Sequence, residues 1–157
     1  MSAQLISDTA PLGAIIRYSD GTPRLPERHR RKLQAWERHN NTGRLVKKHA
    51  ATIVGQTTIP ASFTLHEGDF GSKAVIVLRV FRTFSVDSGL EFSVVERPTA
   101  GAILVLDRPG DAGELVHVAQ NLQAADEWLS RHGYPNAVLR EVTADEAATD
   151  GGEGRAA

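Results

Sequence analysis

The sequence of 157 residues contains no cysteine. This absence excludes a disulfide framework, a zinc site built from thiolates and a cysteine nucleophile. The longest apolar runs, residues 74–78 and 102–106, are far shorter than the ~20 residues that a membrane-spanning helix needs. The first twelve residues carry no Lys or Arg and include Asp8, so they lack the pattern of a secretory signal. We therefore expect a cytoplasmic protein that does not associate with membranes.

Motifs of the common enzyme classes are absent as well. The glycines are scattered and form neither a phosphate-binding loop nor a dinucleotide fingerprint. No serine occupies a nucleophile elbow, and the motifs match no characterised family. We expect no cofactor and no metal site, and the sequence favours a non-enzymatic role without identifying one.

The composition is that of an ordinary globular chain, with 41% hydrophobic and 24% charged residues. The length suits one domain. The order of elements predicts an α+β fold, with a mostly antiparallel sheet of about five to six strands and two helices. Residues 13–143 are expected to form this domain, between a flexible N-terminus at residues 1–12 and a disordered acidic tail at residues 144–157.

The sheet is predicted between residues 63 and 119, where β-branched and aromatic residues are dense. A first hairpin is expected where residues 74–86 turn at Asp87-Ser88-Gly89 and return over residues 90–95. A second hairpin is expected between residues 102–106 and 115–119. Residues 50–62 are expected to be a connection, and residues 137–142 are ambiguous between a strand and a helical turn.

Two helices are predicted, one before the sheet region in the sequence and one after it. The first lies in a basic helical segment at residues 24–48 and is expected to begin at Pro26. Its apolar stripe comprises Leu25, His29, Leu33 and Trp36. The second helix covers residues 121–132, with Asn121 as the N-cap.

The net charge of −1 conceals a strong asymmetry along the chain. Residues 24–48 contain nine Lys or Arg and two acids, whereas residues 107–157 contain ten acids and four arginines. The split indicates a local interaction surface. The alternative is that the two charged regions neutralise each other within the fold.

The basic segment is the main candidate for a binding site. Arginine can hold phosphate with two parallel hydrogen bonds, so these cations could contact nucleic acid, and Trp36 could stack on a base. An acidic protein is the alternative partner, and Trp36 could equally be a core residue. The candidate binding residues are Arg28, Arg30, Arg31, Lys32, Arg38, Arg44, Lys47 and Lys48.

A catalytic site is the third hypothesis. His66 and Asp69 lie in one short stretch, and His117 lies on a later strand, so they could carry out acid–base chemistry in a small hydrolase or nuclease. Their spacing matches no metal motif, and Glu67-Gly68-Asp69 could simply be a turn.

Two arginines interrupt an otherwise apolar strand. Arg79 and Arg82 could be edge residues that discourage aggregation, or cations that bind a ligand on an open sheet face.

Overall fold

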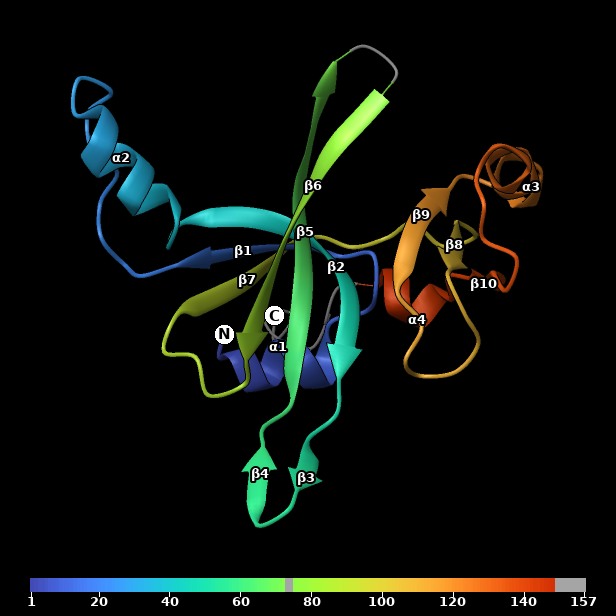
Figure 1. The fold of residues 1–157 in the computed structure, drawn as a ribbon, viewed down its shortest axis with the longest axis horizontal. Coiled ribbons are helices and arrows are strands. Elements are labelled where there is room, and N and C mark those ends of the chain that lie inside the picture. Colours follow the sequence, from blue (N-terminus) through green and yellow to red (C-terminus); the bar gives the residue numbers. More distant parts are fainter. Residues whose placement is uncertain (73–74, 149–157) are drawn as a thin grey trace, which may run out of the picture.

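Antiparallel strands account for most of the regular secondary structure, as the sequence predicts (Figure 1). The computed structural model describes residues 1–72 and 75–148, and that part of the chain contains ten strands and four helices. The main sheet has five strands in the order β6-β5-β2-β1-β7. Their bounds are Ile15–Ser19 for β1, Asn41–His49 for β2, Ser62–Ser72 for β5, Val75–Ser85 for β6 and Glu91–Glu96 for β7. The α+β class is confirmed, with more strands and helices than expected.

Helix α1 (Ala3–Thr9) covers one face of the main sheet. Its residues Ala3 and Ile6 and its C-cap Ala10 are at most 1% exposed and pack in the main core. The expectation that residues 1–12 are flexible is therefore corrected. Alanine gives a weak apolar signal, so the helical spacing of these three residues is easily overlooked. Ser2, whose hydroxyl accepts a hydrogen bond from the Leu5 amide at 3.2 Å, is the N-cap that could have revealed the helix.

A second sheet has three strands in the order β10-β8-β9. Strands β8 (Ile103–Leu106) and β9 (Leu115–Ala119) form the second predicted hairpin, and β10 (Val138–Glu141) resolves the ambiguity at residues 137–142 as a strand. Helix α3 (Leu122–Arg131) packs on this sheet, and the Asn121 side chain accepts from the Ala124 amide at 2.8 Å, as an N-cap does.

The two sheets share a hydrophobic cluster and belong to one domain. Val46 of β2 packs with buried residues of the second sheet and its flanks, while its neighbour Leu45 faces the main core. The register between β2 and β5 shifts between Leu45 and Lys47, and this irregularity lies where the sheets meet. The residues that pack with Val46 are Ala102, Leu104, Leu106, Leu115 and Val142.

The first predicted hairpin is wrong. Strand β7 does return after the turn that follows β6, but it pairs with β1 at the opposite edge of the main sheet. The place beside β6 in the sheet is taken by β5 along ten register pairs, from Ser62↔Ser85 to Ser72↔Val75. Local turn chemistry predicts that the chain turns, and long-range packing decides which strand it meets.

The basic segment at residues 24–48 contains one short helix and most of a strand. Helix α2 (Arg30–Glu37) begins four residues after Pro26, and β2 already begins at Asn41. His29 at the N-cap makes no side-chain capping bond, and the first turn of α2 contains no acid. The helix therefore lacks the features that would extend it towards Pro26.

The remaining elements are short. Strands β3 (Thr52–Val54) and β4 (Thr57–Ile59) form a small hairpin within the expected connection at residues 50–62. Helix α4 (Ala144–Ala147) begins with a capping box between Thr143 and Glu146, so the predicted disordered tail does not begin at residue 144. Residues 149–157 of that tail lie outside the described residues. No helix in the described part of the chain is long and apolar enough to cross a membrane.

Candidate nucleic-acid interface

Five of the predicted binding cations lie in the α2 segment, which we define as residues 28–38. The segment projects from one end of the main sheet, and every residue of α2 is exposed or half-buried (Figure 1). None of its cations forms an ion pair within 4 Å of an acid in residues 1–72 or 75–148. These cations are Arg28, Arg30, Arg31, Lys32 and Arg38.

Polar contacts attach the α2 segment to the sheet at its C-terminal end. The Trp36 indole N–H donates to the Thr22 carbonyl at 3.1 Å, and Asn40 Nδ2 donates to the Trp36 carbonyl at 2.9 Å. The guanidinium of Arg82 on β6 donates to the Arg38 carbonyl. Trp36 is half-buried and its N–H is used within the protein, so it supports the fold of this segment.

Arg82 belongs to a polar cluster that sequence reasoning missed. Its guanidinium carbon lies 5.3 Å from the ring centre of Tyr18 and 5.2 Å from that of Phe84. The buried Tyr18 hydroxyl donates to Glu67. Burial raises the pKa of Tyr18, and the bond to Glu67 acts in the same direction. The side chain of Arg82 therefore points towards the sheet. The only sequence feature that marked Arg82 as a candidate was that it interrupts an apolar strand.

The three remaining predicted cations lie along β2 and make different contacts. Arg44 donates to the Gly13 carbonyl at 2.8 Å, so it joins β2 to the loop before β1. Burial lowers the pKa of Lys48, and the charge of Asp8 partly offsets that effect. Lys48 lies seven residues after the start of β2, about 23 Å along the strand. The eight cations therefore do not form one continuous patch with α2.

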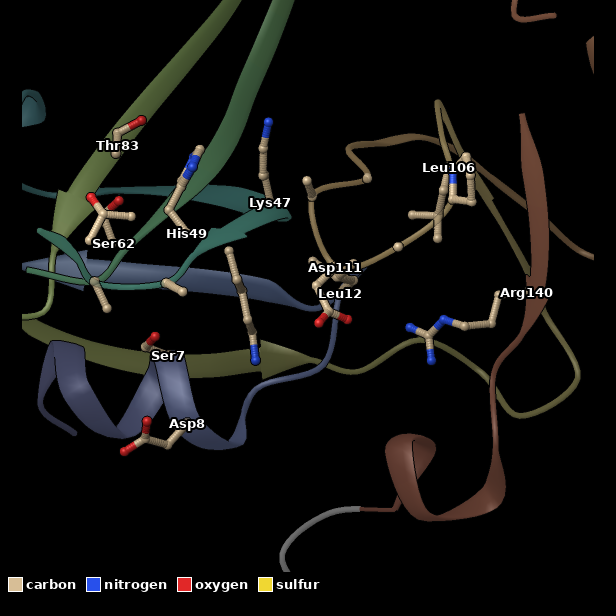
Figure 2. Close-up of a pocket in the computed structure, with 18 of the residues that line it drawn as sticks. Ser7, Asp8, Leu12, Lys47, His49, Ser62, Thr83, Leu106, Asp111 and Arg140 are labelled. Atoms are coloured by element: carbon tan, nitrogen blue, oxygen red, sulfur yellow. The ribbon is translucent and has the colours of Figure 1, made fainter. Parts of the chain in front are cut away.

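Lys47 and Lys48 line an open cleft of about 1330 Å³ between the two sheets. In Figure 2, Lys47 lies on one side of this cleft and Arg140 points into it from β10 on the other. Asp8 and Asp111 also line it, so both signs of charge are present. The mixture of charges makes the cleft a poorer site for a polyanion than the α2 segment.

The three catalytic candidates do not form one site. His66 Nε2 and Asp69 Oδ1 are 2.6 Å apart, and the His66 ring lies 5.1 Å from that of Phe81. His117 instead packs flat against Trp128 of α3 in the second sheet, with ring centres 4.6 Å apart. No contact between described residues joins His117 to His66 or Asp69, because they belong to different sheets. The described residues also include no group of three or more His, Asp or Glu that could hold a metal ion.

These features define a mixed α+β protein built from two antiparallel sheets, with a cationic segment projecting from one of them. Residues 1–146 match the sequence model of the family described as "Uncharacterised conserved protein UCP036055", and the chain belongs to that family. Neither a curated protein nor a solved structure matches the chain.

Proposed function

We propose that this protein is a nucleic-acid-binding module, and that the α2 segment contacts phosphates. The observation that supports the proposal is the set of five cations without an acidic partner among the described residues, on a segment that projects from the fold. Arginine is suited to this role because its planar guanidinium can donate two hydrogen bonds to one phosphate. A cytoplasmic location, where nucleic acid is accessible, is part of the same proposal.

The position of these cations on α2 strengthens the argument. Arg30, Arg31 and Lys32 occupy the first turn of the helix, where the helix dipole is positive. A cation there destabilises the helix by roughly 0.3–1 kcal/mol, and no acid in that turn compensates. A phosphate lying beside the three side chains would remove this repulsion. The free protein thus contains an unfavourable charge arrangement that a bound polyanion would stabilise.

The number of cations sets an expected salt dependence. If the five cations neutralise five phosphates, the slope of log K against log salt is about −3.5 for a single strand and about −4.5 for a duplex. Fluorescence anisotropy titrations with labelled oligonucleotides of both kinds, at several salt concentrations, measure this slope directly. Absence of salt-sensitive binding at low ionic strength would disprove the proposal.

A pair of charge reversals separates binding from folding. We expect Arg31→Glu to weaken oligonucleotide binding about tenfold, since it removes one phosphate contact and adds repulsion. The same change places an acid in the first turn of α2, so the free energy of unfolding should not fall.

Arg131→Glu is the matched control, because Arg131 is an exposed cation in the last turn of α3, where a cation suits the dipole. We expect this variant to lose a few tenths of a kcal/mol in stability and to bind as the wild type does. Equal losses of affinity in the two variants would indicate a nonspecific effect of net charge and contradict the assignment to α2.

An acidic protein is the alternative partner for the same cations. A competition experiment distinguishes the two, because an oligonucleotide that binds α2 should displace such a protein. An acidic protein that remains bound when the oligonucleotide saturates the chain, and is released by Arg31→Glu, would favour the alternative.

A further inference from the structure

The hairpin formed by β5 and β6 extends beyond the rest of the main sheet (Figure 1). Strand β2 pairs with β5 only from Ser62 to His66, so among the described residues the part of the hairpin beyond His66 has two strands and no third. Along its whole length, β6 pairs with β5 on one side and has no backbone partner on the other within residues 1–72 and 75–148. A two-stranded ribbon is only marginally stable alone in water. The hairpin therefore has both unused backbone groups and a need for further packing.

Apolar side chains are exposed on both faces of this ribbon. Phe70 and Leu78 are cross-strand partners and are 61% and 57% exposed. Val75 is 64% exposed and Phe81 is 42% exposed. Exposed apolar side chains beside an open strand edge are typical of a surface that pairs with another strand.

The two edges of the main sheet differ in charge. At the other edge, β7 is short, and the exposed Glu91 and Glu96 stand at its ends. Strand β6 contains no acid, and both of its arginines make contacts within the protein. Arg79 Nε lies 3.8 Å from Asp69 Oδ1, and Arg82 donates to the Arg38 carbonyl. Exposed charges commonly prevent an edge strand from pairing with another chain. Such charges are present on β7, whereas on β6 the charged side chains contact other groups of the same protein.

We propose that β6 pairs with β6 of a second copy of this chain, antiparallel across a two-fold axis. An apolar edge whose charges are engaged within the protein favours a strand of the same kind, and β6 is itself an 11-residue strand of that kind. Two identical strands can pair antiparallel about a two-fold axis, which closes the assembly and leaves no β6 edge open. The ten strands of the two main sheets then form one continuous sheet.

Repulsion between arginines limits the expected register. With the two-fold axis at Val80, Arg79 of one copy lies opposite Phe81 of the other, and Leu78 lies opposite Arg82. Each arginine then meets an apolar or aromatic side chain, and no arginine lies directly opposite another. An axis at Arg79 or at Arg82 would place that arginine opposite its own copy and is disfavoured by repulsion.

The oligomeric state is measured first, by sedimentation of the full chain over a range of concentrations. We expect the mass to approach twice the 17.0 kDa of one chain as concentration rises. Leu78→Lys should shift the association constant at least tenfold towards monomer, because it places a new charge on the edge. Leu78 is exposed in the monomer, so this variant should keep its fold, which circular dichroism checks. A wild-type mass of one chain at every concentration would overturn the proposal, because any strand that pairs with β6 would then have to come from another protein.

The absence of cysteine makes disulfide trapping a clean second test of which edge pairs. Single cysteines at Leu78, Val80, Phe81 and Thr83 are compared under mild oxidation. Opposite Cα atoms of antiparallel strands lie about 4.5–5.5 Å apart, within disulfide range, and partners of the same residue number separate by about 7 Å for each step from the axis. We expect crosslinking to be strongest at Val80→Cys and to fall on both sides. Ser93→Cys on β7 is the control, and a scan in which no β6 position exceeds it would overturn the proposal.

Discussion

The imidazole of His117 lies flat against the indole of Trp128, with ring planes 4° from parallel, and His132 stacks on Trp128 at 3.9 Å. Burial lowers the pKa of His117, and the charges of His132 and Arg44 act in the same direction. The folded protein therefore favours the neutral imidazole of His117 over the protonated form. A residue that the sequence offers as an acid–base catalyst is, in its surroundings, a packing residue of the second sheet.

This environment predicts how stability depends on pH. In the unfolded chain a histidine titrates near pH 6.5, whereas folded His117 binds its proton at lower pH. As pH falls below about 6.5, the unfolded state takes up the proton first, so the free energy of unfolding should decrease until folded His117 is also protonated. Urea denaturation at about pH 7.5 and about pH 5.5 measures the difference. His117→Phe keeps an aromatic ring and cannot titrate, so it should reduce that difference; an unchanged difference would contradict the assignment.

At the scale of elements, α1 shows how a short helix is held by few residues. Ile6 is fully buried between the helix and the sheet, whereas its neighbour Leu5 is 43% exposed. We expect Ile6→Ala to lower the free energy of unfolding by about 2–5 kcal/mol, because it leaves a cavity in the main core. Leu5→Ala is the matched control and should change stability by less than about 1 kcal/mol. Similar losses in chemical denaturation would mean that α1 does not pack as described.

Elements specified by nearby residues were predictable, and those specified by distant pairing were not. The hairpin of β8 and β9 and the N-cap of α3 depend on a turn and a cap within a few residues. Strand β7 pairs with β1, more than seventy residues earlier in the chain, and no local signal indicates that choice. The candidate site divides in the same way: the cations of the α2 segment follow from the sequence, whereas the inward turn of Arg82 depends on a carbonyl 44 residues away.

At the scale of the whole molecule, the described parts of the two oppositely charged regions form no direct ion pair with each other. The ion pairs of the later region are local, between Arg108 and Asp107 and between Arg140 and Glu146. Among residues 1–72 and 75–148, no cation of residues 24–48 lies within 4 Å of an acid of residues 107–148. The charge of Lys47 on β2 helps to lower the pKa of Asp107, so β2 is not fully separate from the later acids. The cations of the α2 segment make no ion pair with the later acids among the described residues, which is the condition that the proposed phosphate contacts require.

The two sheets nevertheless depend on one another through Val46, and this contact predicts a single unfolding transition. In a Trp36→Phe background, Trp128 fluorescence reports on the second sheet, while far-ultraviolet circular dichroism reports mainly on the more numerous strands of the main sheet. Because Val46 packs among Leu104, Leu106 and Leu115, we expect the two signals to change at the same urea concentration. Val46→Ala should lower both midpoints together, with a loss of about 2 kcal/mol. Two separated transitions, or a shift of the Trp128 signal alone, would show instead that the sheets unfold independently and that Val46 does not couple them.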